Sequence, residues 1–318
     1  MQLPHFVRNY IEQQAHGVPL AALEAAATEL SDNYRAAKDT SRIRTNYKSL
    51  AYLATRMPAT FAVAHMVLAE VASHLPDISS VLDLGAGTGA ASIAAQQVFG
   101  TETTLTLVDT DSAFFSEAKQ LLPNSTFIQA DLVSRTELPV ADLIIACYAL
   151  GELSESERKA VLARAWAACG QALVVIEPGT TRGFRNVLAM RDELLAMGAQ
   201  LLAPCPHSLS CPMVGPDWCH FSQRVERSAL HRRLKQGTMG YEDEKYSFVA
   251  FSKVPLQQAQ GRIVRKPIYH PGFVELTMCL PNGIESVGIK KREKDQYRSA
   301  RRAMWGSLWP YKSDALNR

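Results

Sequence analysis

The amino-acid sequence predicts a doubly wound α/β fold with a mostly parallel sheet. From Ser79 onward, seven short apolar runs alternate with stretches of helical periodicity, which is the pattern of repeated β-α units. The first run leads directly into a glycine-rich segment, Asp83 to Gly89, that opens a helical stretch. With 318 residues, 47% of them hydrophobic and 20% charged, the chain can bury a real core, which excludes a disordered protein.

Residues 1–76 are expected to form a helical N-terminal region. Apolar residues recur at three- and four-residue spacing from Leu20 to Arg35 and from Tyr47 to Leu75, with Pro58 interrupting the second stretch. The first 40 residues hold three basic and five acidic side chains and no basic segment followed by an apolar one, so no targeting peptide is expected. No apolar run approaches the ~18 residues of a membrane span. We therefore expect a cytoplasmic protein that does not contact a membrane.

The central domain is expected over residues 77–253, with an insertion at about 204–240 in its last crossover. A basic C-terminal segment, 254–318, follows, with a β-hairpin turning at Pro281-Asn282-Gly283. The expected strands of the domain are Val81–Leu84, Thr104–Val108, Thr126–Gln129, Leu143–Cys147, Ala172–Ile176, Gln200–Ala203 and Ser247–Ser252, and those of the hairpin are Phe273–Leu280 and Ile284–Lys290.

The glycine-rich segment is a candidate cofactor loop. Glycine is needed where a backbone turns sharply or comes close to a ligand, which suits Gly85, Gly87 and Gly89. Asp109 ends the second strand twenty residues after the last of these glycines, where a carboxylate can accept hydrogen bonds from two ribose hydroxyls. Asp131 is expected to end the third strand, in Gln129-Ala130-Asp131, and to meet the adenine edge.

Two cofactors could use such a loop. Dinucleotide sites favour G-x-G-x-x-G and place a pyrophosphate on the helix N-terminus. This chain has G-x-G-x-G preceded by Asp83, which resembles motif I of class I methyltransferases. An acid beside the loop suits the cationic methionine end of S-adenosylmethionine and would repel a diphosphate. We therefore expect S-adenosylmethionine, not NAD, in a class I methyltransferase (Rossmann-like) fold.

No catalytic residue can be identified from the sequence. After the fourth strand, Ala146 to Glu152 replaces the Asn/Asp-Pro-Pro-aromatic motif of amino-directed nucleic-acid methyltransferases. Cys147 lies in an apolar strand without a neighbouring proline, so we interpret it as a buried structural thiol and not as a nucleophile.

The remaining cysteines suggest a metal site. Of the six, Cys147 and Cys169 belong to a strand and a helix end, whereas Cys205, Cys211, Cys219 and Cys279 lie in or near polar loops. In a chain without an export signal such a set indicates metal binding and not disulfides. The spacing C-x5-C-x7-C-x59-C is looser than a zinc knuckle and unlike a ferredoxin run, so zinc and an iron-sulfur cluster both remain open. His207 and His220 are alternative ligands.

The charge is divided unevenly along the chain. Residues 1–220 hold 15 basic and 22 acidic side chains, whereas residues 221–318 hold 19 and 9. Guanidinium groups near Tyr297, Trp305 and Trp309 suit phosphates and unstacked bases, so we predict RNA binding and expect no DNA. The candidate RNA-binding residues are Arg224, Arg227, Arg232, Arg233, Lys235, Lys290, Lys291, Arg292, Arg301 and Arg302.

Several segments of the chain together carry a family resemblance: Tyr52–Thr60, Asp83–Gly89, Ile176–Gly179 with Gly183-Phe184, Cys205-Pro206-His207, Cys211-Pro212, Trp218–Phe221 with Gln223-Arg224, and Tyr297, Ala300–Arg302 and Trp305-Gly306. Through them most of the sequence resembles the methyltransferase-like assembly factors of the small ribosomal subunit, found in mitochondria and, as shorter relatives, in bacteria. The resemblance implies a [4Fe-4S] cluster on Cys205, Cys211, Cys219 and Cys279, binding to small-subunit ribosomal RNA, and a role in subunit maturation or translation. The alternative is an active S-adenosylmethionine-dependent rRNA methyltransferase with a structural zinc or iron-sulfur site.

Overall fold

The computed structural model describes residues 1–35, 46–134, 136–213, 215–257 and 259–310, so parts of the expected helical region and of the C-terminal segment lie outside the described residues. The chain begins with helices α1 (His5–Ala15), α2 (Leu20–Arg35), α3 (Asn46–Thr55) and α4 (Met57–Ala72). Pro58 lies in the first turn of α4, where its missing N–H costs no hydrogen bond. Eleven residues of α4 are buried, because this helix contacts α5 on one side and β7 and β8 on the other.

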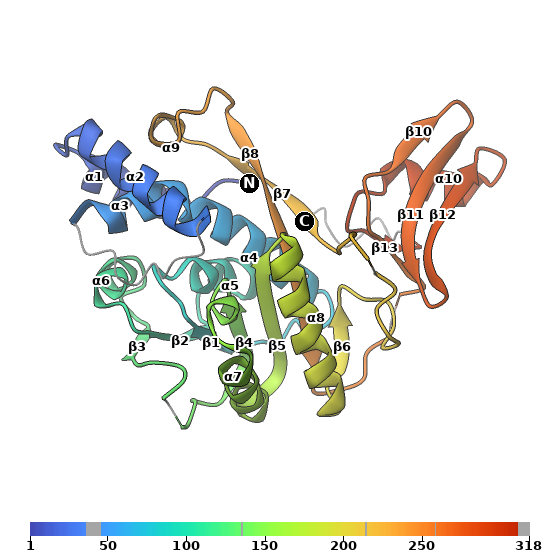
Figure 1. Cartoon of the computed structure of the whole chain (residues 1–318), viewed down its shortest axis with the longest axis horizontal. Helices are drawn as coiled ribbons and strands as arrows, with labels where there is room; N and C mark the ends of the chain where they lie inside the picture. The colour runs from blue at the N-terminus through green and yellow to red at the C-terminus, as the bar shows by residue number, and fades with distance from the viewer. Residues whose placement is uncertain (36–45, 135, 214, 258, 311–318) are drawn as a thin grey trace.

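The predicted doubly wound sheet is confirmed (Figure 1). Strands β1 to β5 run parallel, and β8 closes the sheet antiparallel to β5 and β6, in the order β3-β2-β1-β4-β5-β8-β6. Helices α5 (Ala90–Phe99) and α6 (Ser112–Leu121) cover one face, and α7 (Glu155–Ala168) and α8 (Thr181–Ala196) cover the other. The strands are β1 (Ser80–Leu84), β2 (Thr104–Asp109), β3 (Thr126–Gln129), β4 (Ala141–Cys147), β5 (Cys169–Pro178), β6 (Gln200–Ala203) and β8 (Tyr241–Ser252).

The segment between β6 and β8 contains both a loop and a hairpin arm. The loop from Pro204 to His220 carries three of the four cysteines. Strand β7 (Phe221–Glu226) then pairs with the first half of β8, and helix α9 (Ala229–Leu234) lies at the tip of this arm, against α2 and α3. The sequence pattern missed this first half of β8 because Tyr241 to Tyr246 is rich in charge and lacks the apolar run of a central strand.

The C-terminal segment forms a small domain of its own. Beyond the predicted hairpin of β11 (Phe273–Leu280) and β12 (Gly283–Lys290), its sheet includes β9 (Gly261–Ile263), β10 (Ile268–His270) and β13 (Leu308–Trp309). Helix α10 (Lys294–Arg302) packs on β11 and β12 over a separate apolar core. Strands of two or three residues are too short to show periodicity, so the sequence did not reveal them. Among the described residues, no helix is long and apolar enough to cross a membrane.

Candidate functional site: cofactor loop, cysteine cavity and basic surfaces

The glycine-rich loop joins β1 to α5, and its glycines are required by the backbone. Gly85, Gly87 and Gly89 have φ of 69°, 54° and 80°, values that favour glycine. A Cβ at Gly85 would lie 2.5 Å from that of Ala149, and one at Gly89 would lie 2.9 Å from Leu122 Cδ1. At Gly87 the nearest atom is Phe114 Cδ2, 3.9 Å away, an ordinary van der Waals distance, so the backbone φ and not crowding favours glycine there.

Asp109 at the end of β2 holds the loop in place. Its Oδ2 accepts the Gly87 N–H at 2.7 Å and its Oδ1 accepts the Asp111 N–H at 2.8 Å. Burial raises the pKa of Asp109. Each carboxylate oxygen can accept a further hydrogen bond, so the residue is placed to bind ribose hydroxyls as well as to fix the loop.

Asp83 offers a carboxylate oxygen that is still without a partner. The side chain is 1% exposed, and its Oδ2 accepts the Ser92 hydroxyl at 2.7 Å. Its Oδ1 has no hydrogen-bond partner among the described residues, and burial raises its pKa to about 6. A buried acceptor of this kind is costly unless a donor meets it, so the loop fits a ligand that carries a cationic amino group.

Asp131 lies beyond the end of β3, not at its last residue. It is exposed, and its Oδ1 accepts the Val133 N–H at 2.8 Å. Aromatic residues that the sequence analysis gave no role also border the loop: Phe114 approaches Gly87, and its ring packs on that of Tyr52 in α3 with the centroids 4.7 Å apart. The N-terminal helix α3 therefore packs against α6 next to the loop, a contact that no local sequence signal reveals.

The carboxyl ends of β4 and β5 contain buried polar groups. Cys147 is 7% exposed, and burial raises the pKa of its thiol well above the ordinary value, as expected of a structural cysteine. Tyr148 has a φ of 58°, unusual for a residue with a side chain, and its buried hydroxyl lacks a hydrogen-bond partner in the described part of the chain. Glu177 accepts the Gly151 N–H at 2.8 Å, and burial raises its pKa to about 7.

The four loop cysteines line one cavity between the central sheet and the C-terminal domain. Three come from the loop after β6, and Cys279 comes from β11 near the hairpin turn. Apolar side chains complete the wall, among them Phe184, Met213 and Val264. The cavity has a volume of about 40 Å³, more than the ~10–15 Å³ that one water needs.

Burial favours the neutral form of three of the four thiols. Burial raises the pKa of Cys205 and Cys219 and raises that of Cys279 to about 12. Within the described residues, no three His, Cys, Asp or Glu side chains converge closely enough to hold a metal ion as they stand. The donor chemistry nevertheless fits a four-thiolate centre, because four sulfur ligands share one cavity and a metal displaces their protons on binding.

The two histidines beside the cysteines differ in their surroundings. His207 Nε2 lies 3.6 Å from Cys279 Sγ, within the cavity wall. His220 is packed between two tryptophans, with ring centroids 5.0 Å from Trp218 and 5.0 Å from Trp305. The His220 ring therefore packs the loop against Trp305.

Arg262 on β9 anchors the cavity from the side of the C-terminal domain. The guanidinium is 3% exposed and donates to Pro204 O at 2.7 Å and to Gly306 O at 2.6 Å. It also forms an ion pair with Glu70 of α4. Because β9 pairs with β11 so that Arg262 faces Cys279, this arginine ties the fourth cysteine to the loop of the other three.

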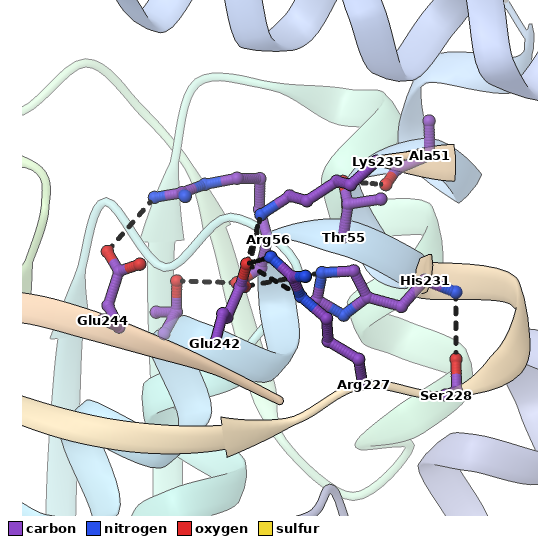
Figure 2. A network of polar contacts seen from close by, with 10 residues as sticks. Ala51, Thr55, Arg56, Arg227, Ser228, His231, Lys235, Glu242 and Glu244 are labelled. Atoms are coloured by element: carbon purple, nitrogen blue, oxygen red, sulfur yellow. Dashed lines mark hydrogen bonds and ion pairs between the residues drawn. The ribbon is translucent and has the colours of Figure 1, made fainter. Parts of the chain in front are cut away.

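Several candidate RNA-binding residues of the arm are engaged in ion pairs (Figure 2). Arg227 Nη2 lies 2.6 Å from Glu242 Oε2, and Lys235 Nζ lies 3.1 Å from the same oxygen. His231, 1% exposed, approaches the other oxygen at 3.4 Å. Arg224 pairs with Asp243 at 2.9 Å and lies over the Tyr241 ring. These cations hold the arm together, whereas Arg232 and Arg233 of α9 are exposed.

A second basic surface lies on the C-terminal domain, far from α9 in Figure 1. Its cations are exposed, and Arg301 lies 5.3 Å over the ring of Tyr269, itself 51% exposed. The sequence analysis did not single out Tyr269, although an exposed aromatic residue beside arginines is a recognised feature of RNA-binding surfaces. We call Lys290, Lys291, Arg292, Arg301 and Arg302 the C-terminal basic surface.

The strand order, crossover helices and glycine loop define a protein of the class I methyltransferase fold. Residues 46–310 match the family described as mitochondrial small ribosomal subunit Rsm22. The chain belongs to this family.

Curated relatives agree with this assignment. The human ribosome assembly protein METTL17, mitochondrial, is 28% identical over 82% of this chain and 62% of its own length. The Rsm22-cox11 tandem protein 2, mitochondrial, of Schizosaccharomyces pombe is 25% identical over 86% of this chain and 44% of its own length. The chain therefore spans about three fifths of the length of the human relative and less than half of the length of the Schizosaccharomyces pombe relative.

These names contradict the expectation of a cytoplasmic protein. Both relatives are called mitochondrial, as is the family, which points to mitochondria. The expectation rested on the composition of residues 1–40, and that composition does not decide the compartment.

Solved structures with a similar fold include two methyltransferases. Magnesium protoporphyrin IX methyltransferase from Synechocystis with bound S-adenosylmethionine is 15% identical, covering 72% of this chain and 97% of that one, with a TM-score of 0.41. An S-adenosylmethionine-dependent methyltransferase from Aquifex aeolicus is also 15% identical, covering 66% and 100%, with a TM-score of 0.41. Likeness at this level carries no argument about function.

The ion cluster around Glu242 yields a prediction about stability. Glu242→Gln should lower the free energy of unfolding by about 2–3 kcal/mol, because it leaves partly buried cations without their counter-charge. Asp243→Asn, which removes an exposed pair one residue away, should cost less than ~1 kcal/mol. Urea unfolding followed by circular dichroism measures both variants. Equal stability of the two would contradict a structural role of the cluster.

The same cluster predicts a loss of stability in acid. Burial alone would raise the pKa of Glu242, but hydrogen bonds from His231 and Arg227 and the charge of Lys235 outweigh it and hold that pKa below its usual range. As the pH falls below the ordinary carboxyl value of about 4.3, the unfolded chain takes up this proton first, so folding stability decreases. Between pH 5 and pH 3, Glu242→Gln should therefore lose less unfolding free energy than the wild type does. The difference between the two losses should be close to the difference between their free energies of unfolding at pH 7.

Proposed function

We propose that this protein is an RNA-binding factor in small ribosomal subunit assembly or translation that binds S-adenosylmethionine and holds a four-cysteine iron-sulfur cluster. The observation that carries the proposal is the joint presence of an intact cofactor loop and four cysteines on one cavity, in a chain of the Rsm22 family. Relatives named for ribosome assembly support the cellular role.

The support for S-adenosylmethionine comes from the acids around the loop. Asp83 Oδ1 is a buried acceptor without a partner among the described residues, and Asp109 is fixed beside Gly87 by a hydrogen bond from its N–H. A diphosphate would bring negative charge toward both carboxylates. S-adenosylmethionine instead brings an ammonium, two ribose hydroxyls and a sulfonium-bound methyl group.

Asp109→Asn should weaken S-adenosylmethionine binding about 10- to 100-fold, because it removes charged acceptors for the ribose hydroxyls worth about 1.5–3 kcal/mol. The control Glu102→Gln, on the exposed turn before β2, should leave the affinity unchanged. Titration calorimetry measures both, with circular dichroism to check folding. Binding of NAD by the wild type without binding of S-adenosylmethionine would refute this assignment.

The support for the cluster is the donor set. Four thiols from two parts of the chain share a largely apolar cavity, the kind of surroundings that limit solvent access to a cluster. Cys205, Cys211, Cys219 and Cys279 would hold it, and a cluster bound there supplies a rigid crosslink between the central sheet and the C-terminal domain.

Protein purified without oxygen should contain about four irons and four sulfides per chain, as a four-cysteine [4Fe-4S] site requires. Serine at any one of the four cysteines should remove most of the iron. Cys169→Ala, at the start of β5 and outside the cavity, should keep it. Iron and acid-labile sulfide assays give the result, and stoichiometric zinc without sulfide would show that the centre is a zinc site.

RNA binding is assigned to the C-terminal basic surface. Its cations are exposed, whereas Arg227 and Lys235 are partly buried and paired with Glu242, and the exposed Arg224 is paired with Asp243. Tyr269 and Arg301 add an exposed ring and guanidinium on which an unstacked base can lie.

The paired substitution Arg301→Glu with Arg302→Glu should weaken binding to small-subunit RNA and reduce the slope of log K against log salt by about one for each phosphate that the protein no longer neutralises. Arg224→Ala should leave that slope unchanged, since its charge is already paired with Asp243. Filter binding at several salt concentrations provides the slopes. An unchanged slope in the double variant would exclude this surface as the site of RNA binding.

A further inference from the structure

Arg191 of α8 reaches the loop that carries the first two cysteines. Its side chain is 4% exposed, and its Nη2 donates to the carbonyls of His207 at 3.2 Å and Leu209 at 2.6 Å. Both carbonyls belong to the stretch between Cys205 and Cys211. The arginine also lines the cysteine cavity, so it contacts the backbone that positions these sulfurs as well as the space between them.

One nitrogen of the Arg191 side chain has no acceptor among the described residues. This Nε is buried and donates no hydrogen bond there. A buried guanidinium N–H without an acceptor is costly, and such a group in a native structure calls for a missing partner.

The charge of Arg191 is less neutralised than that of the other arginine at the cavity. Arg262 forms a two-pronged ion pair with Glu70, whose side chain is 21% exposed. The carboxylate partner of Arg191 is Asp192, which meets one nitrogen at 2.8 Å and is 60% exposed, so water screens much of its charge. A four-thiolate centre of zinc or of [4Fe-4S] carries net negative charge, and Arg191 is the cation that faces it without a buried counter-charge.

We propose that Arg191 is a positioning residue of the four-cysteine centre: it holds the Cys205–Cys211 loop and donates its free Nε–H and its positive charge toward the thiolate sulfurs. This inference rests on the proposed metal site but not on the identity of the metal. Through Arg191, helix α8 of the methyltransferase-like domain acts directly on a centre whose four ligands all follow this helix in the chain.

The test compares Arg191→Gln with Arg191→Lys and with Arg185→Gln, a control on the exposed side of the same helix. In anaerobically purified protein, Arg191→Gln should lower the midpoint potential of the cluster by at least 59 mV, a tenfold change in a one-electron equilibrium. Iron release to an excess of chelator should be about tenfold faster. Arg191→Lys should have the midpoint potential of the wild type, because lysine keeps the charge. Its rate of iron release should lie between those of the wild type and Arg191→Gln, because lysine lacks the planar fork of the guanidinium. Arg185→Gln should match the wild type.

The outcomes separate this inference from the metal assignment. A wild-type potential and release rate in Arg191→Gln would overturn the role of Arg191. If the wild type holds zinc and no sulfide, the iron-sulfur proposal fails, and the zinc release rates of the same variants decide the role of Arg191. Should Arg191→Gln not fold, Asp192→Asn replaces it: freeing the arginine from its carboxylate should raise the potential and slow the release, and an unchanged or opposite result would contradict the proposal.

Discussion

The ion pair between Arg262 and Glu70 joins parts of the protein that share no sheet. Glu70 belongs to α4, which packs between the glycine-loop helix α5 and the arm of β7 and β8. Arg262 belongs to the C-terminal domain and also binds the carbonyls of Pro204, next to the first cysteine, and Gly306. A buried guanidinium requires that all of these acceptors be in place, because the loss of one leaves a charge without its hydrogen bonds. The placement of the fourth cysteine therefore depends on the N-terminal helices as well as on its own strand.

Basic residues in this chain serve two physical purposes that sequence alone does not separate. Some form ion pairs or are buried within the protein: Arg227 and Lys235 pair with Glu242, and Arg191 and Arg262 are buried at the cysteine cavity. Others remain in water, as on the C-terminal domain. The positive excess beyond residue 220 is therefore only partly available to a polyanion, and its free portion is divided between the tip of the arm and the C-terminal domain.

The sequence predicted the central sheet well because a buried strand needs an apolar run, and that requirement is local. It did not predict β7 and the first half of β8, because charged residues interrupt the apolar runs there and form ion pairs across the arm, as Glu242 does with Arg227. The glycines were recognisable because they lie within one tight turn, and Asp109 because a single β-α-β unit fixes its distance from them. Arg191 and Arg262 were not recognisable, since apart from Asp192 the acceptors that hold them lie 16 to 192 residues away and leave no nearby pattern.

The position of Cys279 gives the cavity a fixed order of completion. The first three cysteines precede β7, whereas the fourth follows β8, the strand that closes the central sheet, and β9, the strand that carries Arg262. On a chain made from its N-terminus, the ligand set is therefore incomplete until the whole methyltransferase-like sheet and the first strands beyond it have been synthesised. A metal centre held by all four sulfurs would therefore form only after two separately cored units have docked, and it would close the loop between Cys205 and Cys279, the longest that any pair of these cysteines spans.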